Sequence, residues 1–199
     1  MDSRKRILVI SSKRPFPVQD GASIRTSQMI RMLSQIFEVD LVYTCNPYKT
    51  FADLTELRCF CRQISEFLEP KWKCVLRALL GFFKSRPLQC SYFYSPRMMS
   101  YIQEHLSLYD YVFCNNIRTV PYVDGSKCNK IIDYVDAISM NYIGASLKAN
   151  WIWRLVYKFE ANRLISYENK VLKSFDKFII ISDVDRQFIL RHADLEISN

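Results

Sequence analysis

Residues 6–44, RILVISSKRPFPVQDGASIRTSQMIRMLSQIFEVDLVYT, decide the fold of this chain. The stretch opens with an apolar run, Arg6 to Ser12, which is typical of a strand buried on both faces of a parallel sheet. After a proline-containing loop, Ser23 to Gln35 carries apolar residues at helical spacing, with Ser23 as the expected N-cap. Glu38 to Thr44 then alternates into a second strand. This order predicts a βαβ unit with a right-handed crossover.

The same alternation continues along the chain. The sequence predicts further strands at Tyr109–Asn115, Lys130–Val135 and Lys177–Ser182, and helices at Phe51–Leu68, Lys71–Lys84, Pro96–Leu106, Trp151–Phe175 and Asp183–His192. Five strands separated by helices indicate an α/β fold, in which a Rossmann-like, open, mostly parallel sheet is flanked by helices. We expect residues 1–199 to form a single domain.

Composition limits the class of protein. The 199 residues are 49% hydrophobic and 24% charged, as in a globular protein with a real core. A formal charge of +8 favours anionic partners such as nucleic acid, phosphorylated substrates or an acidic lipid surface. Because no nucleic-acid-binding motif is present, we rank nucleic acid below a membrane and expect no nucleic-acid partner.

Cysteine and histidine usage argues against a metal site. The seven cysteines are scattered without a CxxC pair, and there are two histidines, so we expect free thiols in a reducing compartment. The N-terminal charges are not followed by the apolar run of a signal peptide, and no apolar stretch is long enough to span a bilayer. These features predict a cytoplasmic protein. A GxGxxG fingerprint is also absent, which disfavours a dinucleotide cofactor.

The loop after the first strand is the first candidate ligand site, because ligands of such sheets bind beyond the carboxyl ends of the strands. Gly21 lies there, at the start of a helix whose N-terminal amides favour phosphate, and Arg25 follows one turn later. An ordinary turn glycine and a solvated arginine are the alternative interpretation.

Four segments together resemble the N-terminal domain of the family 4-like glycosyltransferases of the GT-B fold, in their bacterial polysaccharide-biosynthesis branch. They are residues 14–44 with their Pro-x-Pro loop, glycine and arginine, KIIDYVDAIS (130–139), FEANRLISYE (159–168) and FDKFIIISDVD (175–185). They cover nearly the whole chain in the family's order.

The resemblance implies roles for individual residues. Gly21 matches the glycine that lies against the donor diphosphate. Asp133 and Asp136 fall where many relatives have a cleft-facing His-Asp pair, and they are the catalytic candidates, although this chain has no histidine there. At strand ends these carboxylates could orient sugar hydroxyls or accept a proton, or they could cap the next segment.

Other positions receive weaker assignments. Ser182 and Asp183 follow the last predicted strand at a cleft-facing position, and Asn115 ends another strand, so all three are substrate-binding candidates. The charged residues of the long helix, Glu160, Arg163 and Glu168, are expected to form surface ion pairs at near-helical spacing.

The resemblance also implies an activity. Relatives transfer a sugar from a nucleotide-sugar to a lipid-linked or polysaccharide acceptor, without a tightly bound cofactor, and they have a second domain that binds the donor. Nothing in these 199 residues matches that second domain, so we expect this chain to be the acceptor-side half and inactive by itself. The alternative is a non-catalytic membrane-docking or acceptor-binding subunit that recruits a separate catalytic chain.

Lys71 to Lys84 is a basic amphipathic segment. Its apolar face consists of Trp72, Val75, Leu76, Leu79, Leu80 and Phe83, bordered by Lys73, Arg77 and Lys84. Such a helix suits the interface of an anionic membrane, where each cation contributes about 1 kcal/mol. We therefore predict peripheral docking on the inner membrane leaflet, near a lipid-linked acceptor. Packing of this face on the sheet as part of the core is the alternative.

Overall fold

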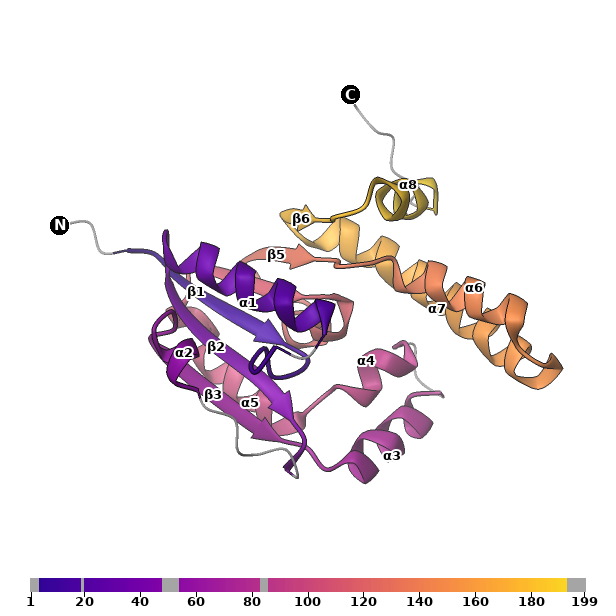
Figure 1. Cartoon of the computed structure of the whole chain (residues 1–199), viewed down its shortest axis with the longest axis horizontal. Helices are drawn as coiled ribbons and strands as arrows, with labels where there is room; N and C mark the ends of the chain where they lie inside the picture. The colour runs from indigo at the N-terminus through magenta and orange to yellow at the C-terminus, as the bar shows by residue number, and fades with distance from the viewer. Residues whose placement is uncertain (1–3, 19, 48–53, 83–85, 193–199) are drawn as a thin grey trace.

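The computed structural model describes residues 4–18, 20–47, 54–82 and 86–192 (Figure 1). Six strands form one sheet in the order β3-β2-β1-β4-β5-β6, and every neighbouring pair is parallel. They are β1 (Arg6–Ser11), β2 (Glu38–Cys45), β3 (Gln63–Leu68), β4 (Tyr111–Asn115), β5 (Asn129–Asp133) and β6 (Lys177–Ile179). The predicted Rossmann-like α/β fold is confirmed. The chain runs outward from β1 in both directions, which puts the topological switch point between β1 and β4.

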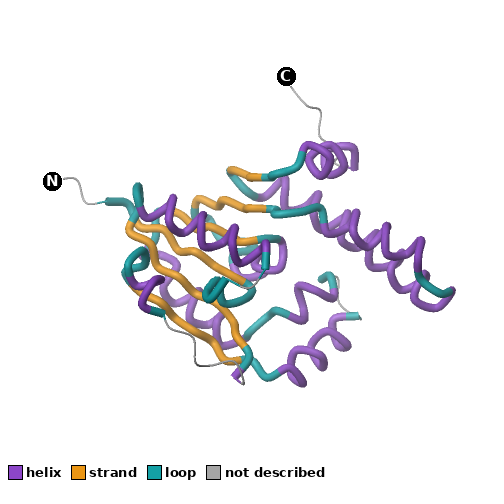
Figure 2. The backbone as a smooth tube through the Cα atoms, viewed as in Figure 1, coloured by secondary structure: helices purple, strands orange, loops and turns teal. Residues whose placement is uncertain are grey.

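Helices cover both faces of the sheet (Figure 2). They are α1 (Gly21–Ser34), α2 (Thr55–Arg58), α3 (Lys71–Gly81), α4 (Leu88–Tyr92), α5 (Pro96–His105), α6 (Ile138–Lys148), α7 (Trp151–Ser174) and α8 (Asp183–His192), with short 3₁₀ helices η2 (Leu106–Leu108) and η3 (Ile117–Tyr122). Helices α6 and α7 form a hairpin that extends beyond the sheet (Figure 1).

Strand alternation divides the core into two layers. In β1, Ile7 and Val9 face a cluster that includes Ile30 of α1 and Leu57 of α2. Leu8 and Ile10 face the opposite cluster, which is built from α5, η3 and α7. All four β1 side chains are fully buried, as expected for a central parallel strand covered on both faces.

Two local predictions are wrong. The predicted helix Phe51–Leu68 begins outside the described residues, and its described part, residues 54–68, forms α2 followed by the edge strand β3, so the described sheet has six strands instead of five. The sequence of β3 did not predict a strand because the strand is partly polar. Its half-buried Glu66 pairs with Arg14 and interrupts the apolar alternation typical of a strand. The N-cap of α1 is Asp20, and Ser23 is the third helical residue of the same capping box.

Candidate functional site

A row of polar side chains crosses the sheet at the carboxyl ends of its strands. Register pairs Glu66 with Tyr43, Tyr43 with Ser11, Ser11 with Asn115 and Asn115 with Asp133. Two or four residues earlier in each strand, on the same face of the sheet, the side chains are apolar. They are Ile7, Val9, Val39, Leu41, Phe113 and Ile131. The face therefore changes from apolar to polar where the first turns of α1 cover it, at the edge where ligands of this fold class bind.

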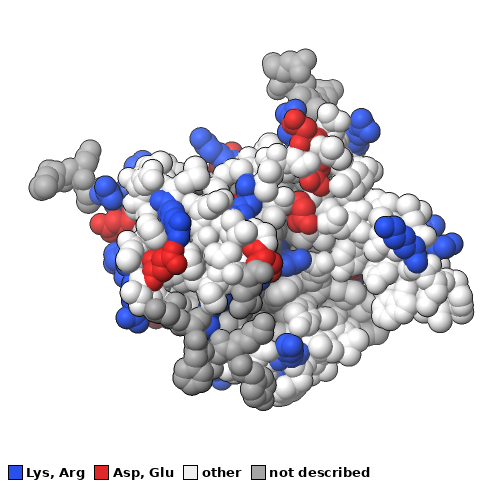
Figure 3. Space-filling model, viewed as in Figure 1, with Lys and Arg blue, Asp and Glu red and all other residues white. Residues whose placement is uncertain are grey.

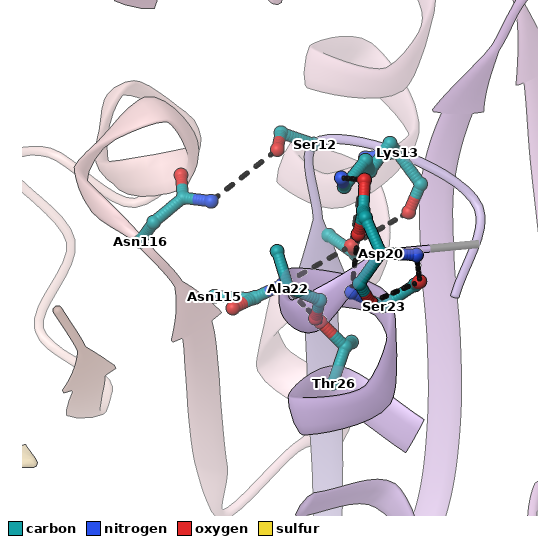
Figure 4. Close-up of polar contacts among 9 residues, drawn as sticks. Ser12, Lys13, Asp20, Ala22, Ser23, Thr26, Asn115 and Asn116 are labelled. Carbon is teal, nitrogen blue, oxygen red and sulfur yellow. Dashed lines mark hydrogen bonds and ion pairs between the residues drawn. The ribbon is translucent and has the colours of Figure 1, made fainter. Parts of the chain in front are cut away.

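The N-terminus of α1 is capped and carries a paired charge (Figure 4). The Asp20 carboxylate accepts a hydrogen bond from the Ser23 amide at 2.8 Å and forms an ion pair with Lys13, which follows β1. The Lys13 ammonium and the Ser23 amide lower the pKa of Asp20 to about 2. Gly21 begins the helix, and apart from its chain neighbours and its own helix backbone no atom of the described residues lies within 4 Å of the position that a Cβ would take there. The first turn of α1 is thus open to approach from outside the helix.

Two asparagines join the strands on either side of the switch point (Figure 4). The Asn115 side-chain amide donates to Thr26 Oγ1 at 2.6 Å and to Ser11 Oγ at 3.4 Å. Asn116 donates to Ser12 Oγ at 3.4 Å. Asn115 is 2% exposed, and its Oδ1 has no hydrogen-bond partner within the described ranges. Asn115 thus holds the site together and retains one free acceptor.

The candidates Arg25 and Asp133 bind each other. Arg25 Nε donates to Asp133 Oδ2 at 2.6 Å, and Arg25 Nη2 donates to Oδ1 at 2.7 Å. The Asp133 side chain is fully buried, and its Oδ1 also accepts from the Val135 amide at 3.3 Å. A proton acceptor must reach its substrate, so Asp133 in this arrangement serves the fold, and the same ion pair occupies the Arg25 guanidinium.

Backbone strain follows two of the central strands. Asn116 has φ 66° directly after β4, and Val135 has φ 60° two residues after β5. Positive φ is unusual for a β-branched residue and costs about 1–3 kcal/mol, and such residues concentrate at ligand sites. Here the strained turns lead to Arg118 and Asp136, the next charged residues along the chain.

Sequence reasoning missed Arg118. This half-buried side chain donates to Gln89 Oε1 at 2.7 Å and lies 4.8 Å above the centre of the Phe93 ring. No carboxylate among the described residues pairs with it, and burial lowers its pKa. Its position after a strand end was the only available signal, since no motif marks it.

Asp136 is the accessible carboxylate of the predicted catalytic pair. It is partly buried and accepts a hydrogen bond from the Asn141 side chain at 2.7 Å. Burial raises the pKa of Asp136, while the positive charge of Arg118 opposes that rise and Asp185 adds to it. Asp136 and Arg118 are therefore within electrostatic range of each other without an ion pair. A carboxylate with a raised pKa is suited to accept a proton.

The other end of the site is formed by α8. Ser182 Oγ accepts from the Asp185 amide at 3.4 Å and thus caps the helix, while Asp183 is exposed and pairs with Arg186 at 3.3 Å. Asp185 Oδ1 accepts from the Ala137 amide at 3.2 Å, next to Asp136. Of these residues, Asp185 has the direct connection to the loop that carries Asp136.

A pocket of about 130 Å³ opens at the carboxyl ends of β1 and β2. Its lining comes from the ends of β1 and β2 and from the α3–α4 region, and includes Ser12, Lys13, Thr44, Cys74 and Phe93. Phe93 is the ring beneath Arg118, so the pocket adjoins the cationic side of the site. A polar group bound at the strand ends would have an aromatic wall next to it.

The predicted membrane segment is mostly exposed. Trp72 and Leu80 are 65% and 55% exposed, and Lys73 lies 5.4 Å from the centre of the Trp72 ring. The core alternative is therefore wrong for the described part of α3. Arg77 does not fit the predicted membrane interface, because it pairs with the buried Glu69 at 2.7 Å and its side chain is only 20% exposed. Phe83 and Lys84 lie outside the described residues.

The charged residues of α7 are not surface ion pairs as predicted. Glu160 and Glu168 are 0% and 2% exposed. Glu160 pairs with Arg163 at 3.1 Å, and Arg163 also donates to the Gly81 carbonyl at 3.0 Å, which fixes the end of α3. Glu168 accepts from the Ser139 amide and hydroxyl, and burial raises its pKa to about 7. These residues are structural, because each carboxylate is held by donors from another segment.

Within residues 4–18, 20–47, 54–82 and 86–192, no cluster of histidine, cysteine and carboxylate side chains could hold a metal ion, and no helix is long and apolar enough to cross a membrane. Fold and site together define a Rossmann-like α/β protein with a polar, charged site at its switch point. Comparisons of the chain with protein-family models and with curated proteins found no match.

Proposed function

We propose that this chain is the acceptor-side half of a two-domain glycosyltransferase, which transfers a sugar from a nucleotide-sugar to a glycan or lipid-linked acceptor. The observation that carries the proposal is that the open N-terminus of α1 at Gly21, Arg118 and Asp136 follow the carboxyl ends of β1, β4 and β5, and that Arg118 and Asp136 lie within electrostatic range of each other. Phosphate-binding and proton-accepting groups at one edge are what the transfer of a sugar from a diphosphate requires.

The α1 end supports contact with a donor diphosphate. Its first amides and the helix dipole favour an anion, and the absence of a side chain at Gly21 lets a phosphate oxygen approach the backbone. Asp20 is negatively charged there, but the ion pair with Lys13 compensates this charge. Arg118 adds a cation without a carboxylate partner in the described chain. We propose that the rest of the donor site belongs to a second domain.

On the acceptor side, Asp136 would receive the hydrogen bond of the attacking hydroxyl. As the oxygen forms its bond to the anomeric carbon, the hydroxyl proton passes to Asp136 and the bond from that carbon to the diphosphate oxygen breaks. The nucleoside diphosphate leaves with the electron pair, and Arg118 is positioned near the growing negative charge. The raised pKa of Asp136 brings the carboxylate closer to the range useful for this step.

The experiment is a donor panel assay on the complete gene product. The protein is incubated with individual nucleotide-sugars and a crude lipid and glycan extract, and the released nucleoside diphosphate is measured. We expect release that depends on the extract and falls by about 100-fold or more in Asp136→Asn. Glu104→Gln, an exposed carboxylate on α5, is the matched control and should retain wild-type activity. Absence of release with every donor, or equal activity in Asp136→Asn, would reject the proposal.

A non-catalytic docking or acceptor-binding subunit is the second candidate. It is favoured by the exposed apolar surface of α3 and by the ion pair that engages Asp133. Co-purification distinguishes the two: a subunit should bring down a separate chain that supplies donor-dependent activity, and that activity should survive Asp136→Asn.

A further inference from the structure

All three tryptophans of the chain are exposed, one on α3 and two at the start of α7. Trp72 on α3 is 65% exposed, and Trp151 and Trp153 at the start of α7 are 73% and 55% exposed. Each exposed ring leaves a large apolar area in water, and a large exposed apolar patch marks an interaction site.

The tryptophans belong to a larger apolar surface, which we call the docking surface. It comprises Trp72, Val75, Leu76, Leu79, Leu80 and Phe82 of the α3 region and Leu147, Trp151, Ile152, Trp153, Leu155 and Phe159 of the α6–α7 hairpin, each at least 46% exposed. The Phe82 and Phe159 rings lie 5.2 Å apart and join the two parts. Arg163 also ties them together through the Gly81 carbonyl. The surface is thus composite, and α3 supplies only part of it.

The charges around the docking surface indicate which kind of partner would bind it. Residues 70–103 and 137–159 contain no aspartate or glutamate. The exposed cations of the docking surface are Lys71, Lys73, Lys148, Arg154 and Lys158, and none forms an ion pair with a carboxylate in the described part of the chain. Figure 3 shows blue side chains among uncharged ones over this part of the molecule. A second copy would oppose like charges, whereas an anionic bilayer complements both the apolar area and the cations.

We propose that the docking surface inserts into the interface of an anionic lipid bilayer, with the three tryptophans at the level of the lipid headgroups. The strands β1 and β2 point toward the side of the molecule that carries α3 and the α6–α7 hairpin (Figure 1). Bilayer contact therefore leaves the carboxyl edge of the sheet near the membrane. This proposal concerns lipid binding alone and stands whether or not the glycosyltransferase proposal holds.

Tryptophan fluorescence tests the proposal directly, because all three tryptophans of the chain are exposed and are among the residues that the proposal places at the bilayer. The chain is titrated with phosphatidylcholine vesicles with and without phosphatidylglycerol, some carrying brominated acyl chains. We expect a blue shift, quenching by the brominated lipids and flotation with the anionic vesicles, all weakened by salt. Equal effects with neutral vesicles, or none with either kind, would overturn the proposal.

Matched variants locate the contact. Leu79→Glu on α3 and Leu155→Glu on α7, 64% and 63% exposed, should each lower vesicle affinity by about tenfold or more. Lys158→Gln should lower it by about fivefold. Ile36→Glu is the control. Ile36 is 67% exposed and precedes β2, at the amino-terminal edge of the sheet, so the vesicle affinity of this variant should equal that of the wild type. Circular dichroism checks that each variant folds.

Each remaining outcome contradicts the proposal. Wild-type flotation by both Leu79→Glu and Leu155→Glu would place lipid binding elsewhere. A blue shift that grows with protein concentration without vesicles would assign the surface to a second copy. Capture of a protein partner that displaces the vesicles would assign it to a protein interface.

Discussion

Arg25 and Asp133, 108 positions apart, fix the first turns of α1 over the end of β5 through two short hydrogen bonds of 2.6 and 2.7 Å. The pair sets where Gly21 lies relative to the switch point. Because Asp133 is fully buried, the pair belongs to the framework of the site and determines the position of the groups that face outward.

Breaking this pair should destabilise the fold strongly. Arg25→Met leaves a buried carboxylate without its cation, so we expect the free energy of unfolding in urea to fall by about 3–5 kcal/mol. In a double-mutant cycle, Asp133→Asn should cost much less in the Arg25→Met background than in the wild type.

The control for that cycle is the exposed pair Lys170–Asp124, whose side chains are 58% and 32% exposed. Lys170→Met should change the free energy of unfolding by less than about 1 kcal/mol. Equal effects of Arg25→Met and Lys170→Met would show that the Arg25–Asp133 pair does not hold the site.

Stability should depend on pH through Glu168. Burial raises the pKa of this carboxyl from 4.5 to about 7 in the folded chain, so the folded state binds the proton more tightly than the unfolded state. The stability that proton binding to Glu168 adds to the folded state is fully present below pH 4.5 and is lost as the pH rises through about 7. The free energy of unfolding then falls by roughly 3 kcal/mol.

Glu168→Gln isolates this effect, because glutamine keeps a carbonyl toward Ser139 without a titratable proton. We expect the variant to lose most of the decline in thermal stability between pH 5 and pH 8. A decline as steep as in the wild type would assign the pH dependence to other groups.

The hydrogen bond from Asn115 to Thr26 should be worth measuring by itself. Thr26→Val keeps the shape of the side chain but removes the acceptor 2.6 Å from the Asn115 amide, leaving a longer bond to Ser11. We expect a loss of about 1–3 kcal/mol in urea unfolding. Ser166→Ala, on the exposed face of α7, should cost less than about 0.5 kcal/mol; equal losses would contradict the role of Asn115.

The parallel α/β architecture was predictable because apolar runs such as residues 7–10 have the length and burial of central strands. The edge strand β3 was not, since its polar Glu66 is stabilised by Arg14 and Tyr43 from distant segments. A local pattern cannot reveal a partner that is brought close only by the fold.

The same limit applied to the site. Sequence position placed Gly21 and Arg25 at the start of the first helix and Asp133 at a strand end, but it gave no indication that Arg25 and Asp133 bind each other. The sequence did not identify Arg118, because its neighbours Gln89 and Phe93 are brought close only by the fold. Both are uncharged, so the guanidinium has no carboxylate beside it among the described residues. The sequence also could not predict the exposure of Trp151, since a tryptophan at the start of a helix can lie in a core as well as on a surface.

Binding of a diphosphate at the α1 end can be measured by titrating the ¹⁵N-labelled chain with pyrophosphate and following the amide signals of Gly21 and Ala22. We predict saturable shifts with a dissociation constant of roughly 1 mM, and their loss in Gly21→Ala. That variant should be as stable as the wild type, or up to about 1 kcal/mol more stable, because a methyl group there would clash with no atom of the described residues. Unchanged amide signals in the wild type, or an identical titration of Gly21→Ala, would show that the α1 end is not a diphosphate-binding site.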